Sequence, residues 1–120
     1  MQDNDSTGLP VRPNDLPSVT HDIMTGHGLL HVVVGLLDSK PVEVFAHYNL
    51  KVDPCTKGNS EAICRAISLG LRRGIDVAEF VKQLSFIECG HKFIAADGQS
   101  VTSVADGISK VLSKYMVDKP

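Results

Sequence analysis

The chain has 120 residues, a length that accommodates one domain with a single core. Apolar residues make up 42% of the sequence and charged residues 22%, which excludes a disordered or collagen-like chain. The formal net charge is −2, a balance that argues against a nucleic-acid partner. Residues 1–18 contain Pro and Gly without hydrophobic periodicity, and predict a flexible lead-in before a single domain of residues 19–117.

The cysteines and the N-terminus bear on the cellular compartment. Cys55, Cys64 and Cys89 are odd in number and irregularly spaced, which argues against a disulfide framework and for a reducing environment. The acidic N-terminus lacks the apolar segment of a secretory signal, and no apolar run approaches the ~20 residues of a membrane helix. We therefore expect a cytoplasmic protein with no membrane partner.

The first half of the chain predicts strands. Residues 20–25 predict a short strand, and the β-branched residues of 29–37 and 41–48 predict two longer ones. The segment 38–40 has turn chemistry, so the two longer strands should close an antiparallel hairpin across a three-residue turn.

This hairpin sorts its side chains onto two faces. The face expected to meet helices is uniformly apolar and carries Leu30, Val32, Val34, Leu36, Val42, Val44, Ala46 and Tyr48. The other face is mixed and carries His31, Val33, Gly35, Leu37, Glu43, Phe45 and His47. Because exposed apolar residues on one side of a sheet commonly mark an interface, the interface candidates are Val33, Leu37, Glu43 and Phe45.

The second half of the chain predicts helices. Apolar residues recur with the helical period in three segments, residues 60–73, 77–84 and 104–116, and a short edge strand is expected at 91–96. The predicted structural caps are Asn59 or Ser60 for the first helix, Asp76 with Glu79 for the second, and Ser103 with Asp106 for the third. Strands followed by helices indicate an α+β fold, an antiparallel sheet with two or three helices packed on one face.

Histidines suggest one weak metal site. His31 and His47 face each other across the predicted hairpin, close enough to share an ion. A stable site needs three or four ligands, and Glu43 is the nearest further candidate on that face. The alternative is that both histidines are ordinary sheet surface, and we expect the chain to carry no cofactor of its own.

Catalysis has little support in the sequence. Cys89 and His91 could pair a nucleophile with a base, but no orienting carboxylate accompanies them, so we predict no catalytic residue and no autonomous enzyme. A site around them would need a partner chain to complete it. The basic helix from Arg65 to Arg73 leaves open an alternative, a small regulator that binds nucleic acid or a small ligand.

A set of segments occurs in a characteristic order, namely Arg12-Pro13 with Leu16, then residues 20–25, 28–32, 41–45, 64–75, 81–84 and 102–108. Together they resemble the TSCPD domain, which occurs at the C-terminal end of adenosylcobalamin-dependent (class II) ribonucleotide reductases and as small independent proteins. The resemblance covers about residues 12–115, nearly the whole chain.

The family's name-giving motif is only partly retained. Val104 and Ala105 stand in place of its Cys and Pro, so redox work at this position is not expected. Ser103 and Asp106 are retained, and helix capping explains both. The reductase barrel and its cobalamin site do not fit in 120 residues. The resemblance therefore implies a non-catalytic accessory module that docks on a reductase large chain or on a second copy of itself, with adenosylcobalamin involved only through a reductase chain.

Overall fold

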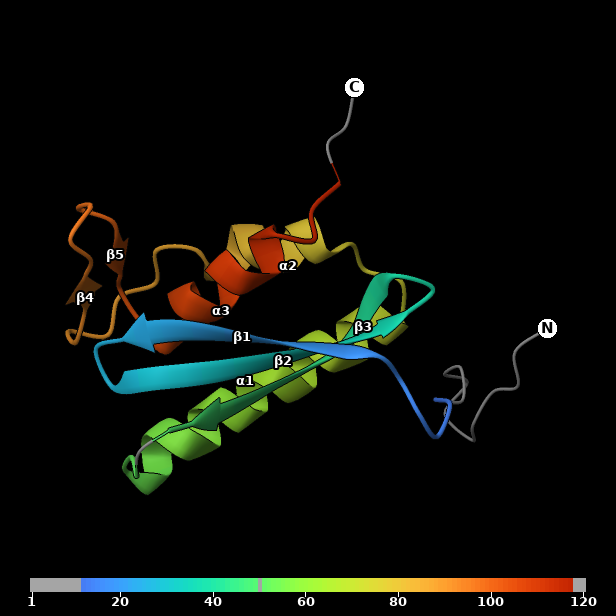
Figure 1. Ribbon diagram of the computed structural model, residues 1–120, viewed down its shortest axis with the longest axis horizontal. Helices are drawn as coiled ribbons and strands as arrows, with labels where there is room; N and C mark the ends of the chain where they lie inside the picture. Colours follow the sequence, from blue (N-terminus) through green and yellow to red (C-terminus); the bar gives the residue numbers. More distant parts are fainter. Residues whose placement is uncertain (1–11, 50, 118–120) are drawn as a thin grey trace.

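The three strands predicted from the sequence form the frame of the molecule. The computed structural model describes residues 12–49 and 51–117. Its elements, in chain order, are β1 (Ser18–Thr25), β2 (Gly28–Leu37), β3 (Lys40–Tyr48), α1 (Pro54–Arg72), α2 (Val77–Leu84), β4 (Phe93–Ile94), β5 (Ser100–Val101) and α3 (Val104–Ser113) (Figure 1). The expected α+β class is confirmed.

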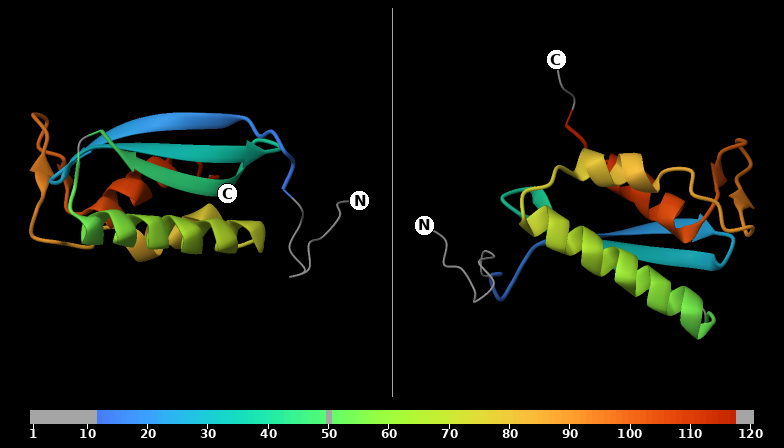
Figure 2. Two further views of the ribbon diagram at one scale, coloured as in Figure 1. Left: turned by 90° about the horizontal axis from the view of Figure 1, so that it is seen from below. Right: turned by 180° about the vertical axis from the view of Figure 1, so that it is seen from behind.

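The large sheet is antiparallel in the order β1-β2-β3, and within residues 12–49 and 51–117 the helices all lie on one of its faces (Figure 2). The core lies between that face and the helices, and its members include Leu30, Val32, Val34 and Val44 from the sheet with Ile67, Ile108, Val111 and Leu112 from the helices. The predicted apolar face of the hairpin is therefore the buried one, as the period-two alternation required.

The hairpin turn is tighter than predicted. Asp38 and Ser39 alone connect the strands, both with positive φ (51° and 65°), the backbone of a two-residue turn. Lys40 belongs to β3 and pairs with Leu37, and the register shifts between Gly35 and Leu36. This irregularity absorbs the difference, so the pairs from the middle of the hairpin onward follow the predicted register.

The helices differ from prediction mainly at their ends. α1 begins at Pro54, well before residue 60, because Asp53 caps it by accepting a hydrogen bond from the Thr56 N–H at 2.9 Å. Proline suits this first position since it has no N–H to leave unpaired. Ser60, an expected cap, is instead buried within α1. α2 has its predicted bounds, and α3 ends at Ser113 rather than at residue 116.

The Phe80 ring of α2 packs closely against α1 at Gly70. A Cβ atom there would lie 2.3 Å from Cζ of Phe80 and 3.3 Å from Cδ1 of Ile75. Asp76 begins α2 by accepting from the Ala78 N–H at 3.1 Å. α2 then packs against α3, while α1 packs against β3.

The predicted edge strand at residues 91–96 is wrong in extent and in partner. Only Phe93–Ile94 is extended, and it pairs with Ser100–Val101 in a separate two-stranded sheet. Figure 1 shows this sheet beside the β1–β2 turn, at one end of the molecule. Among the described residues, no helix combines the length and the apolar character needed to cross a membrane.

Candidate functional site

The sheet face opposite the helices carries the main candidate surface. In the strand register Val33 lies between Thr20 of β1 and Phe45 of β3. Phe45 is 47% exposed, and Met24 toward the end of β1 is 41% exposed. In the left view of Figure 2, none of the helices and strands of the described residues lies over this face. We refer to Met24, Val33 and Phe45 with the strand surface around them as the open face.

A polar row crosses the open face next to these residues. The register places Asp22, His31 and His47 side by side on the three strands. The imidazole of His31 lies 2.5 Å from Oδ1 of Asp22, measured from Nδ1, and this hydrogen bond raises the pKa of His31. His31 and His47 are thus neighbours, but in the described part of the chain no third ligand joins them in a cluster suited to a metal.

Glu43, the further ligand considered for that site, is occupied elsewhere. It accepts from Arg12 through both oxygens, with Nε–Oε2 at 3.0 Å and Nη2–Oε1 at 2.8 Å. Its side chain crosses Gly35, where a Cβ atom would lie 2.6 Å from the Glu43 Cγ. Glycine at this position therefore lets Glu43 anchor the segment that precedes β1.

The four interface candidates do not form one patch. Val33 and Phe45 lie on the open face, and Glu43 is held in its ion pair with Arg12. Leu37 lines a cavity of about 520 Å³ at the hairpin end of the molecule, together with Leu71, Ile75 and Tyr115. In the strand register Leu37 pairs with Lys40, next to the tight turn.

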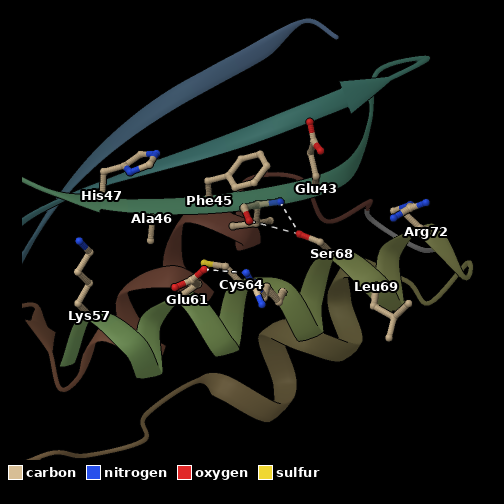
Figure 3. A pocket seen from close by; sticks show the side chains of 12 residues that line it. Glu43, Phe45, Ala46, His47, Lys57, Glu61, Cys64, Ser68, Leu69 and Arg72 are labelled. Atoms are coloured by element: carbon tan, nitrogen blue, oxygen red, sulfur yellow. Dashed lines mark hydrogen bonds and ion pairs between the residues drawn. The ribbon is translucent and has the colours of Figure 1, made fainter. Parts of the chain in front are cut away.

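A groove of about 670 Å³ runs along the free edge of β3, where α1 forms its other wall (Figure 3). Ser68 of α1 covers part of the edge: its hydroxyl accepts from the Val44 N–H at 2.9 Å and donates to the Val44 carbonyl at 3.3 Å. Phe45 lines the groove as well, so the groove is continuous with the open face. An edge with unpaired backbone groups is a natural site for a partner segment.

The groove wall from α1 mixes charges. Its basic residues are Lys57, Arg65 and Arg72, and Glu61 forms an ion pair with Arg65 at 3.0 Å. Cys64, also in the wall, is 4% exposed, and burial raises the pKa of its thiol to about 12. A thiol that stays protonated is a poor nucleophile, so Cys64 acts as a small core residue.

The segment that carries the family-like motif is structural. Ser103 caps α3 by accepting from the Asp106 N–H at 2.9 Å. Asp106 is 0% exposed and accepts from the Phe86 N–H at 2.8 Å, the Thr102 N–H at 3.0 Å and Nζ of Lys110 at 2.6 Å. Its carboxylate thereby ties the loop after α2 to the start of α3.

Sequence reasoning missed the partner of Cys89. The structure places the Sγ atom 3.5 Å from Nε2 of His27, a residue that the sequence indicated only as part of the turn between Gly26 and Gly28. His91 lies beside both. No local signal joins positions this far apart, and only the packing of the two loops brings them together.

Comparison with protein families gives a match that covers most of the chain. The model of the TSCPD domain matches residues 5–116, and this family is associated with ribonucleotide reductases. Neither a comparison with curated proteins nor one with solved structures gave a significant match. Since the match spans nearly the whole chain, the protein belongs to the TSCPD domain family.

Proposed function

We propose that this chain is an accessory, non-catalytic module of a ribonucleotide reductase, and that it acts by docking its open face on the catalytic chain. The observation that carries the proposal is the one-sided cover of the sheet: in the described part of the chain, the helices all lie on one face. The register places Phe45, Met24 and Val33 on the other face. Aromatic residues and Met are enriched in the cores of protein interfaces, and the polar row of Asp22 and His31 would form part of a rim.

The open face alone is too small for a standard protein interface, so we include the groove along β3 in the docking site. Strands of about eight residues at ~3.4 Å per residue and ~4.8 Å apart present roughly 400 Å², about half of the ~800 Å² that each partner contributes to a standard interface. Phe45 lies at the boundary of the open face and the groove. We therefore place the docking site over β3, with Phe45 at its centre.

Chemistry is assigned to the partner in this proposal. Radical formation and any adenosylcobalamin would belong to the catalytic chain, and the module would contribute binding surface. Charges of both signs in the groove, including the Glu61–Arg65 pair, suit a protein surface better than a nucleic-acid backbone.

Calorimetry with the catalytic chain of the same organism's reductase tests the proposal. Phe45→Ser should weaken binding at least about tenfold, the loss typical of a buried interface anchor. Ile94→Ser is the matched control, because Ile94 is 61% exposed on the separate β4–β5 sheet. Both side chains are exposed, so far-UV circular dichroism should show folded variants.

Four outcomes would contradict the docking proposal. Wild-type chain could fail to bind the reductase, or the Phe45 and Ile94 variants could bind equally well. Sedimentation equilibrium could instead show a homodimer that Phe45→Ser dissociates, which would make a second copy the occupant of this surface. Salt-dependent binding to DNA that is lost on substitution of Arg65 would favour the regulator alternative.

A further inference from the structure

Three potential metal ligands meet at the end of the molecule where the β1–β2 turn contacts the loop after α2. Sγ of Cys89 lies 3.5 Å from Nε2 of His27, and the rings of His27 and His91 have their centroids 4.9 Å apart. The ligand atoms of all three residues lie within 4.8 Å of one another. Figure 1 shows this end of the chain, with the small β4–β5 sheet beside the turn.

The backbone holds the turn that carries His27. Thr25 is 3% exposed, and its hydroxyl donates to the Gly28 carbonyl at 2.8 Å and accepts from the His27 N–H at 3.1 Å. Gly28 has a φ of 110°, a conformation that suits glycine. The position of His27 is therefore set by hydrogen bonds around it rather than by its own side chain.

The opposite loop is held just as firmly against the turn. A Cβ atom at Gly26 would lie 1.9 Å from the His91 carbonyl oxygen, so the two backbones are in direct contact only because position 26 is glycine. The Cys89 N–H donates to the Thr102 carbonyl at 3.2 Å. Backbone contacts and hydrogen bonds therefore hold both loops in place, and they bring the three side chains of the cluster together.

The donor set and its spacing fit zinc. Zinc takes Cys sulfur at ~2.3 Å and His nitrogen at ~2.0–2.1 Å, and in tetrahedral geometry two such ligands lie roughly 3.5 Å apart. The Sγ–Nε2 distance between Cys89 and His27 is 3.5 Å. A thiol–imidazole pair alone would account for these two residues but would leave the position of His91 unexplained.

We propose that His27, Cys89 and His91 form a three-ligand zinc site that links the β1–β2 turn to the loop after α2. The fourth position would be open to water, because the nearby carboxylate of Asp53 is already engaged in capping α1 through Thr56. The charge of Asp53 is within electrostatic reach of His27 and would add to the attraction for a cation. This proposal does not rest on docking to a reductase.

Zinc itself, and cobalt as its spectroscopic substitute, are the probes. The full chain, stripped with a chelator, should bind one Zn²⁺ by calorimetry, and Co²⁺ should give the charge-transfer band of a thiolate ligand. Cys89→Ser should abolish this band. His27→Gln and His91→Asn should each weaken zinc binding at least about 100-fold. Even loss of a residue that only hydrogen-bonds to a metal ligand typically lowers metal affinity about 10–100-fold.

Two variants serve as matched controls. Cys55 is the other exposed cysteine in the described residues, and His47 is an exposed histidine outside the cluster. Cys55→Ser and His47→Ala should bind zinc as the wild type does. The proposal is overturned if wild-type chain binds no zinc, if Cys89→Ser retains full affinity, or if the controls lose as much as the cluster variants. With chelator present, all variants should have the same melting temperature as the wild type, because the changed side chains are wholly or partly exposed.

Discussion

Replacing Asp106 by Ala should be the most destabilising single polar substitution among those considered for this chain. The carboxylate is 0% exposed and accepts three hydrogen bonds, from two backbone N–H groups and from Lys110. Removal leaves the N–H groups of Phe86 and Thr102, both in part-buried hydrogen bonds, without this acceptor. It also detaches the loop after α2 from the start of α3.

The size of the effect follows from these partners. A hydrogen bond to a charged group contributes about 1.5–3 kcal/mol. Because these two bonds are only part-buried, water can replace part of each, and we take about 2–4 kcal/mol for the pair. The Lys110 side chain is 32% exposed, so its ammonium group can return to water and the full ~3–5 kcal/mol of a broken buried ion pair is not added. We expect a loss of about 2–5 kcal/mol in the free energy of unfolding, a large part of the ~5–15 kcal/mol of a typical domain.

Urea unfolding followed by circular dichroism measures this loss. Asp97→Ala is the control, since Asp97 is exposed and its Oδ1 accepts from the Gln99 N–H at 3.0 Å in a surface turn. That control should change stability by about 0.5 kcal/mol or less. If Asp106→Ala costs no more than Asp97→Ala, the buried carboxylate is not the anchor described above.

Acid should reveal the same anchor. Burial acts to raise the pKa of Asp106, but the hydrogen bonds from Lys110, Phe86 and Thr102 outweigh it and leave the pKa below its usual value. The ionised Asp106 carboxylate therefore stabilises the fold fully above the unfolded-state pKa of ~3.9, and this contribution is lost as pH falls through the lower folded-state pKa. The difference in stability between wild type and Asp106→Asn should shrink over that acidic range, and a constant difference would contradict the ionic contribution.

Two further predictions concern packing and the open face. Gly70→Ala should cost about 1–3 kcal/mol in urea unfolding because its Cβ would lie 2.3 Å from the Phe80 ring, whereas Gly58→Ala, in the same helix with nothing within 4 Å, should add about 0.5–1 kcal/mol. Equal effects at both sites would contradict the packing argument. In NMR titrations His31 should titrate above its usual pKa and move down in Asp22→Asn, because the hydrogen bond that raises the pKa is lost; an unchanged titration would show that Asp22 is not the cause.

The hairpin and α2 could be predicted from local sequence, for a physical reason. In a strand, alternate residues point to opposite faces, so the apolar positions around Val32 and Val44 identify the buried face without knowledge of any partner. Asp76 begins α2 through a contact two residues away, which local sequence contains in full. Asp53 begins α1 in the same way, but the polar stretch from Thr56 to Asn59 hides the helical period.

The open face and the proposed zinc site both depend on parts of the chain that are distant in sequence. Alternation indicates that the face around Phe45 is mixed, but only the packing of α1 and α3 decides that the helices leave it uncovered. His27 and Cys89 lie far apart in the sequence, and their proximity requires the contact between Gly26 and the His91 backbone. Local propensities therefore determined the strands of the large sheet, both ends of α2 and the start of α3. The candidate sites instead arise where separate elements meet, because contacts between side chains distant in sequence exist only after the chain has packed.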